Sequence, residues 1–397
     1  MSLLQLALAA LLVFLSLAVL YLFFLAAVYF LRKPVEKGEV CPPTLRFAII
    51  IPAHNESEGI AGTLHSLKAL DYPGLLYEAV VVDDNCTDNT AETVRAEGFR
   101  CVERNDPSKR GKGHALEYAI RGLMREEFDA FAVVDADSTV SGNFLHVMNA
   151  RLLSGHKAVQ AYYGMNNPDA SPLAYLFCIG NILENKLFYA AKSKLGLPVN
   201  LRGNGMCFSR ELLIENPWDA YSIAEDVEYG LKLIRRGIRI PFEEEAQVLA
   251  RQPETIKQAG NQRIRWASGN MGASKAHAVK LMLAGLTKGD PALFDAGFSL
   301  LVLSKPLLLL LSLLAAAGAT LYAASGGIRG SFYAVWALSL LLAQLVYFAT
   351  GVLMGGVSAR RVVYLLLSPV FLAWLIFTSA LGLVGYRGDL WLRTKRA

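Results

Sequence analysis

The chain has 397 residues, of which 54% are apolar and 18% charged, with a net charge of +5 and a mean hydropathy of +0.35. Its five cysteines form no CxxC pair or Cys/His cluster, which argues against a disulfide framework or zinc site and fits a reducing cytoplasm. No basic run lies on an aromatic-rich strand or helix, so the sequence also argues against a nucleic-acid partner.

The apolar residues are segregated along the chain. Leu3–Leu31 and Ala292–Tyr386 are overwhelmingly apolar, whereas the residues between them have the composition of a globular domain. This pattern predicts three parts: a transmembrane anchor over 1–32, a catalytic-sized α/β domain over 33–275, and interfacial and transmembrane helices over 276–397.

The first apolar stretch is long enough to cross a bilayer as a helix. It lacks a basic segment before it and ends in Arg32-Lys33 rather than at a small-residue cleavage site, so we expect an uncleaved anchor. The positive-inside rule then places the following domain in the cytoplasm, as in a protein of the bacterial inner membrane. Basic residues beside the apolar stretches suit contact with anionic membrane lipids.

The central part alternates short apolar runs with amphipathic segments, which is typical of a mainly parallel α/β sheet. The runs predicted as strands are Phe47–Ile51, Ala79–Val82, Phe131–Val134 and Ala158–Tyr163. The clearest helix is predicted over Val227–Arg236, with Gly237 at its C-terminal end.

The turn after the first strand has its own signals. Pro52 is expected to stop that strand, and Asn55 is expected to cap the next helix, with Glu58 three residues later. Apolar residues then follow at helical spacing, at Ile60, Leu64 and Leu67.

Three further apolar stretches follow the central part. Phe298–Tyr322 and Phe332–Leu353 are each long enough to cross a membrane, and a glycine-rich turn joins them. If Val362–Val384 also crosses, the basic C-terminal tail ends outside, against the charge rule. A re-entrant or in-plane segment keeps the tail in the cytoplasm and suits Pro369 and Trp374, so we favour this second placement.

Acidic residues follow two of the predicted strands. Val82 is followed by Asp83 and Asp84, and the strand ending at Val134 is followed by Asp135 and Asp137 in a DxD arrangement. Because the carboxyl ends of parallel strands meet at one crevice, these side chains are expected to lie close together. Two such carboxylates can serve a divalent ion together with a sugar or ribose hydroxyl. The alternative is that they only form turns and helix caps.

Arg110-Gly111-Lys112-Gly113 could bring a cation and a close-approaching backbone to a diphosphate. The segment lacks the residue order of a P-loop, and a solvated loop is an equally good reading of it alone.

Glu225 and Asp226 precede a predicted helix, where a carboxylate could act as a general base toward an acceptor hydroxyl. The alternative is that both acids only favour the positive end of that helix.

The pentad 262–266, QRIRW, places Gln262, Arg265 and Trp266 on one helical face. An amide, a guanidinium and an indole on one face suit phosphate binding and stacking against a sugar. An interfacial helix with a Trp–Arg anchor is the alternative.

Taken together, the residues from about Arg46 to Trp266 resemble the inverting glycosyltransferase family 2, in its membrane-integrated branch with cellulose, chitin and hyaluronan synthases. The resemblance implies a GT-A fold, a Rossmann-like α/β sandwich, flanked here by transmembrane helices. It also implies one direct displacement that gives a β-linkage, with Mg²⁺ or Mn²⁺ as cofactor.

On the donor side, Pro52 and Glu56 lie in the segment that resembles the family's opening strand and nucleotide-binding loop. Asp84, with Asp83 beside it, matches the aspartate that contacts the donor base. Lys112 lies in the family's RGKG stretch, and the DxD match supplies two further residues, Asp135 as a substrate contact and Asp137 as the metal ligand.

On the acceptor side, Gly203 and Asn204 match the glycine loop below the acceptor. In the ED motif, Glu225 is a substrate contact and Asp226 matches the catalytic base. The QxxRW match comprises the residues expected to hold the diphosphate and flank the acceptor, Gln262, Arg265 and Trp266.

The large synthases have six or more membrane segments, whereas this chain has three or four. We therefore expect transfer from a nucleotide sugar, a UDP-sugar in the first instance, to a lipid or lipid-linked acceptor rather than to a growing glycan. A processive polysaccharide synthase of the cellulose or hyaluronan type is the alternative. A transporter is disfavoured because no inverted repeat is evident, and a binding-only protein because Asp226 is present. An oxidoreductase is disfavoured because no GxGxxG follows the first strand.

Overall fold

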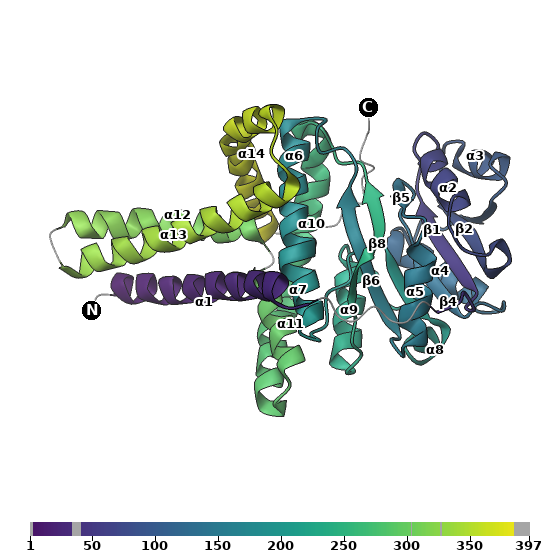
Figure 1. The fold of residues 1–397 in the computed structure, drawn as a ribbon, viewed down its shortest axis with the longest axis horizontal. Helices are drawn as coiled ribbons and strands as arrows, with labels where there is room; N and C mark the ends of the chain where they lie inside the picture. The colour runs from purple at the N-terminus through teal and green to yellow at the C-terminus, as the bar shows by residue number, and fades with distance from the viewer. Residues whose placement is uncertain (1–2, 34–40, 303, 326–327, 385–397) are drawn as a thin grey trace.

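A computed structural model describes residues 3–33, 41–302, 304–325 and 328–384 (Figure 1). Its strands are β1 (Phe47–Ala53), β2 (Tyr77–Asp84), β3 (Arg100–Arg104), β4 (Ala130–Val133), β5 (Ser138–Val140), β6 (Ala158–Met165), β7 (Met206–Ser209) and β8 (Phe242–Ala250). The helices that pack around them are α2 (Ile60–Lys68), η1 (Gly74–Leu76), α3 (Thr90–Ala96), α4 (Lys112–Leu123), α5 (Phe144–Leu153), α8 (Arg210–Glu215) and α9 (Glu225–Arg235).

A second group of helices lies on the side of the sheet away from β3. It comprises α1 (Leu3–Leu31), α6 (Pro172–Ile182), η2 (Leu183–Ala190), α7 (Ala191–Lys194), α10 (Ile256–Lys288), α11 (Pro291–Val302), α12 (Lys305–Ala324), α13 (Ile328–Gly355) and α14 (Ala359–Leu383). In Figure 1, α6, α10 and α11 stand between the sheet and the long helices α1, α12 and α13.

The eight strands form one sheet in the order β3-β2-β1-β4-β7-β6-β8-β5. β3, β2, β1 and β4 are parallel neighbours, as predicted, whereas β7 is antiparallel to both β4 and β6. The sheet is therefore mixed, and the parallel half places the carboxyl ends of β1, β2 and β4 along one edge.

Both faces of this parallel half are buried, because successive side chains of a strand point to opposite faces. Ile50 of β1 lies in the core that continues into the second group of helices, whereas Ile49 and Ile51 lie in the core beneath α2 and α5. The predicted apolar positions of α2 are fully buried in that second core: Ile60, Leu64 and Leu67.

Two expectations for the first turn are wrong. β1 continues through Pro52 to Ala53. Its pairing with β4 ends at Ile50, so the amide hydrogen that Pro52 lacks removes no hydrogen bond to β4. Asn55 does not cap α2: its φ of 58° is left-handed, and its side-chain oxygen accepts the amide of Thr87 at 2.7 Å.

Within the described residues, four helices are long and apolar enough to cross a membrane, over Gln5–Leu31, Lys305–Ala324, Arg329–Gly355 and Ala359–Gly382. The predicted span Phe298–Tyr322 is wrong in its first part, because α11 ends at Val302 and α12 begins at Lys305. α1, α12 and α13 run side by side, and the indole of Trp336 donates to Ser16 Oγ at 2.9 Å (Figure 1).

α14 covers the third apolar stretch and contains Pro369. It packs on α6 and α10, where Trp374 joins a cluster with Phe177, and Figure 1 shows it running across α12 and α13 rather than along them. The basic tail 393–396 lies outside the described residues. The predicted domain limit at residue 275 falls inside α10, and the three-part division stays a prediction.

A buried polar cluster joins α1 to α7 and α11. Lys192, fully buried, lies 2.8 Å from a carboxylate oxygen of Asp295 and donates to Ser299 Oγ at 2.9 Å. The hydroxyl of Tyr21 donates to the other oxygen of Asp295 at 2.6 Å. Each charge has a partner, so the cluster fixes α1 in place without leaving an unpaired ion in the core.

Candidate active site

Asp84, at the end of β2, is fully buried. Its Oδ1 accepts hydrogen bonds from Arg104 and from the Asn85 amide, the latter at 2.9 Å. Burial raises the pKa of Asp84, and the Arg104 guanidinium opposes that shift. Oδ2 has no hydrogen-bond partner among the described residues, so it can accept a bond from a ligand.

The neighbours of Asp84 shape the first part of the site. Asp83 is 6% exposed and its Oδ1 accepts the amide of Cys86 at 3.3 Å, which makes Asp83 a turn-holding residue in this structure. Pro52 lies near the end of β1, and Glu56 follows in the loop, where its amide donates to Thr90 Oγ1 at 2.9 Å. Asp83 and Asp84 are thus the last residues of β2, and Pro52 is the residue before the last of β1.

Lys112 begins α4 and reaches across the site. Its Nζ donates to a carboxylate oxygen of Asp135 and, at 2.6 Å, to the carbonyl oxygen of Gly203. Burial works to lower the pKa of Lys112, but Asp135, Glu225 and Asp226 outweigh it and hold the pKa above its usual range. Lys112 thus bridges the DxD segment and the glycine loop, and its contact with a diphosphate stays a prediction.

Asn204 holds the DxD segment from the other side. Its Oδ1 accepts the amide of Asp135 at 3.1 Å and its Nδ2 donates to Ser138 Oγ at 2.8 Å. The side chain of Gln160, in turn, donates to the Asn204 carbonyl at 2.8 Å. Because Asn204 is fully buried, these bonds fix the backbone around Asp135 and Asp137.

Asp226 lies in the first turn of α9, where its Oδ1 accepts the amide of Val227 at 2.8 Å. Burial raises the pKa of Asp226, with the Val227 bond and the Lys112 cation acting against it. Burial and the Asp226 charge also raise the pKa of Glu225 to about 8. Two adjacent carboxyls thus share a site in which both resist ionisation, a pattern common where a proton is transferred.

Gly203 packs directly against Asp226. It has a φ of 73°, and a Cβ at this position would lie 3.2 Å from Asp226 Oδ2. Only glycine combines that backbone conformation with that approach.

The QRIRW pentad lies in α10 and presents its two arginines differently. Burial lowers the pKa of Arg265, whereas Glu225 and Asp135 act in the opposite direction, so Arg265 lies within electrostatic range of two carboxylates of the site. Arg263 stacks over Phe177 of α6 at 3.7 Å and over Trp266 at 5.2 Å. Gln262 has a buried Oε1 with no partner in the described part of the chain.

Within residues 3–33, 41–302, 304–325 and 328–384, no three His, Cys, Asp or Glu side chains converge on a metal position. Asp135 and Asp137 nevertheless fit a hard divalent ion, since Mg²⁺ is commonly held by one or two carboxylates plus substrate phosphates. Asp135 pairs with Lys112, and Asp137 Oδ1 accepts a hydrogen bond from the Ser138 hydroxyl at 3.1 Å. The assignment of the ion to Asp137 stays a prediction.

Sequence reasoning missed two residues of this site. Arg104, at the end of β3, neutralises Asp84, and Arg202, just before Gly203, pairs with Glu184 at 3.3 Å. Arg104 is the last residue of β3, and strand ends are positions where site residues are expected. No local pattern indicates Arg202, because its partner Glu184 lies in η2.

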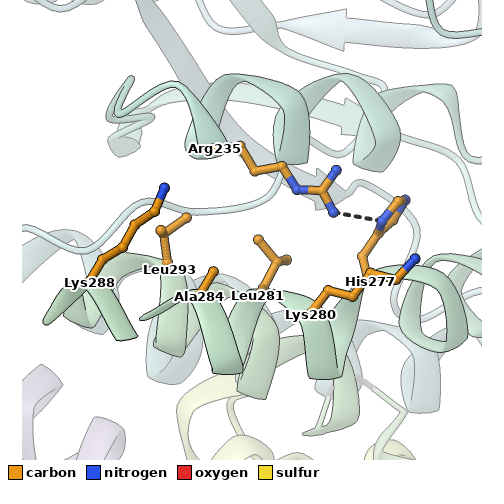
Figure 2. A pocket seen from close by; sticks show the side chains of 7 residues that line it. All are labelled: Arg235, His277, Lys280, Leu281, Ala284, Lys288 and Leu293. Atoms are coloured by element: carbon orange, nitrogen blue, oxygen red, sulfur yellow. Dashed lines mark hydrogen bonds between the residues drawn. The ribbon is translucent and has the colours of Figure 1, made fainter. Parts of the chain in front are cut away.

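A separate hollow of about 400 Å³ lies between α9, α10 and α11. Figure 2 shows Arg235, Lys280 and Lys288 at its rim, and Arg235 bonds to His277 Nδ1 at 2.7 Å. Arg235 is nine residues beyond Asp226 on α9, about 14 Å along the helix. The hollow is therefore distinct from the site around Asp226.

The sequence model of the family described as Glycosyltransferase like family 2 matches residues 42–269. The probable glycosyltransferase YdaM of Bacillus subtilis is 28% identical over 234 residues, covering 57% of this chain and 55% of that protein. The poly-beta-1,6-N-acetyl-D-glucosamine synthase of Staphylococcus aureus is 27% identical over 235 residues, covering 55% and 53%. The chain thus spans about half the length of these curated relatives.

Among solved structures, the mannosyltransferase PcManGT from Pyrobaculum calidifontis, in complex with GDP-Man and Mn²⁺, superposes with a TM-score of 0.61 at 22% identity. The match covers 96% of this chain and 99% of that one, so it includes the long apolar helices. The likeness shows that the mixed sheet has the GT-A fold.

Proposed function

This chain belongs to the family described as Glycosyltransferase like family 2 and is a nucleotide-sugar glycosyltransferase; from that premise we propose that it transfers one sugar to a lipid or lipid-linked acceptor at the cytoplasmic membrane face. The observation that carries the proposal is the half-buried Asp226 carboxylate, which lies against the Gly203 loop and next to Glu225, a carboxyl that interacts electrostatically with Arg265.

The donor is proposed to lie along the carboxyl ends of β2 and β4. The unpartnered Oδ2 of Asp84 would accept a hydrogen bond from an N–H of the nucleobase. Arg265 would face the diphosphate, the group with the largest charge. A UDP-sugar is the predicted donor, and the bound GDP-Man of PcManGT makes a GDP-sugar the other candidate.

Mg²⁺ or Mn²⁺ is the proposed cofactor, with Asp137 as its protein ligand and Asp135 beside it; the ion would supply positive charge near the diphosphate. Mn²⁺ accompanies GDP-Man in PcManGT, which supports this assignment. Lys112 keeps Asp135 in position through its bridge to Gly203.

Asp226 is proposed as the general base. Its Oδ2 would accept the proton of an acceptor hydroxyl while that oxygen bonds to the anomeric carbon. The bond from the anomeric carbon to the diphosphate breaks, and the diphosphate keeps the electron pair, which Arg265 stabilises. Burial raises the pKa of Asp226, which makes it a better proton acceptor than an exposed aspartate. Attack opposite the leaving group inverts the anomeric centre.

The membrane placement rests on charge. Arg32 and Lys33 follow α1, and Arg360 and Arg361 begin α14, which supports a cytoplasmic position for these helix ends. The packing of α14 on α6 and α10 supports its placement in the plane of the membrane surface.

The second candidate function is a processive polysaccharide synthase, which the likeness to poly-beta-1,6-N-acetyl-D-glucosamine synthase favours. The test uses the full chain in lipid nanodiscs with Mn²⁺ and a panel of radiolabelled UDP- and GDP-sugars, with products separated into lipid-extractable and polymeric fractions. Label in the lipid fraction alone supports single transfer. A ladder of sizes overturns it in favour of a synthase, and no incorporation from any donor counts against both.

A further inference from the structure

A group of cations lies within electrostatic range of Glu184 and includes the first residue of α12. We call Arg202, Arg263 and Lys305 the membrane-side cations. Arg202 precedes the Gly203 loop, Arg263 comes from α10, and Lys305 is the first residue of α12. All three act electrostatically on one carboxylate, that of Glu184.

The contacts of the three cations leave them incompletely neutralised. Arg202 lies 3.3 Å from Glu184 Oε2 and donates to Asn185 Oδ1 at 2.7 Å. Arg263 packs on aromatic rings, and Lys305 Nζ lies 5.6 Å from the centre of the Phe188 ring. Neither has a hydrogen bond or ion pair to any of the described residues. Three positive charges therefore share one carboxylate.

Such an excess of buried positive charge is energetically costly unless a bound anion balances it. Burial lowers the pKa of Arg263 to about 10, although Glu184 and Tyr163 act to raise it. Burial alone would raise the pKa of Glu184, but Arg202, Lys305 and Arg263 hold it below its usual range. The local field is thus positive even after Glu184 is counted.

The cations are also connected to the candidate base. Tyr189 lies close enough to Glu184, Arg202 and Asp226 to interact electrostatically with all three. Glu184 and Tyr189 belong to η2, which is a π-helix, a rare conformation often found at functional sites. The donor's diphosphate is assigned to Arg265, which interacts electrostatically with Glu225 and Asp135, whereas Arg263 packs on Phe177 of α6.

We propose that the membrane-side cations bind the phosphate or diphosphate group of a lipid-linked acceptor, and so position its hydroxyl at Asp226. The position of Lys305 at the beginning of a spanning helix places the anion at the membrane surface, where the headgroup of an anchored lipid lies. The inference rests on the proposed function and specifies its acceptor: a lipid that carries an anionic phosphate group rather than a neutral glycan.

The test measures binding, without donor or turnover. Full-length protein in phosphatidylcholine nanodiscs is titrated with radiolabelled farnesyl phosphate and, separately, with the uncharged alcohol farnesol. We expect Arg263→Gln and Lys305→Gln each to weaken farnesyl phosphate binding about tenfold and to leave farnesol binding unchanged. Glu184→Gln should tighten farnesyl phosphate binding, since it removes the competing carboxylate.

Lys288→Gln is the matched control, because Lys288 is a lysine of the hollow in Figure 2 and lies outside the proposed site. Unchanged affinity for UDP or GDP shows that each variant is folded. Equal binding of farnesol and farnesyl phosphate, or equal affinity in all variants, overturns the proposal. Displacement of farnesyl phosphate by phosphatidylglycerol or by inorganic phosphate at equal concentration also overturns it, in favour of a general lipid or anion site.

The outcome is separable from that of the proposed function. Binding that follows these expectations without any sugar transfer would fault the proposed function alone. Transfer to a lipid that is equally fast in wild type and in Arg263→Gln would fault the cation assignment alone.

Discussion

Gly203 lies so close to Asp226 that a Cβ on the glycine would stand 3.2 Å from the aspartate's Oδ2. The contact couples the glycine loop to the carboxylate proposed as base. We therefore expect Gly203→Ala to displace that carboxylate and lower kcat about a hundredfold, with nucleotide affinity nearly unchanged. Gly196→Ala is the control: its φ is 72°, but nothing lies within 4 Å of its Cβ position. Equal losses in both variants would mean that backbone strain, not Asp226, explains the effect.

Asp226→Asn keeps the shape of the side chain and removes its basicity. We expect kcat to fall by about a hundredfold to ten-thousandfold, and donor affinity to change little. Single-turnover transfer and nucleotide binding are measured together. Asp219→Asn, which alters an exposed aspartate paired with Lys232, should retain activity. Loss of donor binding in Asp226→Asn would contradict the role of Asp226 as a base.

Lys112→Met should shift the pH dependence of kcat/KM. The Lys112 cation lowers the pKa of Asp226 against the larger effect of burial, so removing it raises that pKa further. A base acts when deprotonated, and the acid limb of the profile therefore moves to higher pH. Lys112→Arg keeps the charge and should leave the limb near its original place. If the acid limb does not shift in Lys112→Met, the group that titrates in the profile is not Asp226.

Chelation by EDTA should stop turnover, and added Mn²⁺ or Mg²⁺ should restore it, because Asp137 and Asp135 are suited to share an ion with the donor's phosphates. Asp137→Asn should require about tenfold more metal for half-maximal rate. The measurement is a metal titration of initial rate. Full activity in EDTA would remove the ion from the proposal.

Arg265→Gln should weaken binding of the nucleoside diphosphate by about tenfold or more, since a charge-assisted contact is lost. Equilibrium binding of UDP and GDP measures the effect directly. Arg235→Gln, in the hollow away from the site, should bind both normally. Unchanged diphosphate affinity in Arg265→Gln would indicate that the pentad anchors the helix at the membrane and does not bind the donor.

Local sequence patterns predicted the parts of the fold that local physics controls. Ile60, Leu64 and Leu67 are buried because their spacing matches a helix, and Asp84 and Asp135 lie near one sheet edge because both follow parallel strands. Asn55 was misread because its left-handed backbone depends on a bond to the amide of Thr87, a partner more than thirty residues away.

Long-range contacts set the rest of the site. No spacing rule indicates that Lys112 bridges Asp135 and Gly203, or that Arg104 neutralises Asp84, because each pair meets only through the sheet. The sequence also does not indicate the break between α11 and α12, since Lys305 is the single charged residue of Phe298–Tyr322 and its other polar residues are isolated Ser and Thr.

The buried Lys192–Asp295 pair bears on how the protein is made. Tyr21 and Lys192 are synthesised before Asp295, so during translation the carboxylate that they share is absent until α11 emerges. α1 can already contact η2 and α7, because Lys194 donates to the carbonyl oxygens of Tyr29 and Arg32. A chain that stalls before α11 would therefore hold Lys192 beside α1 without the carboxylate that balances its charge.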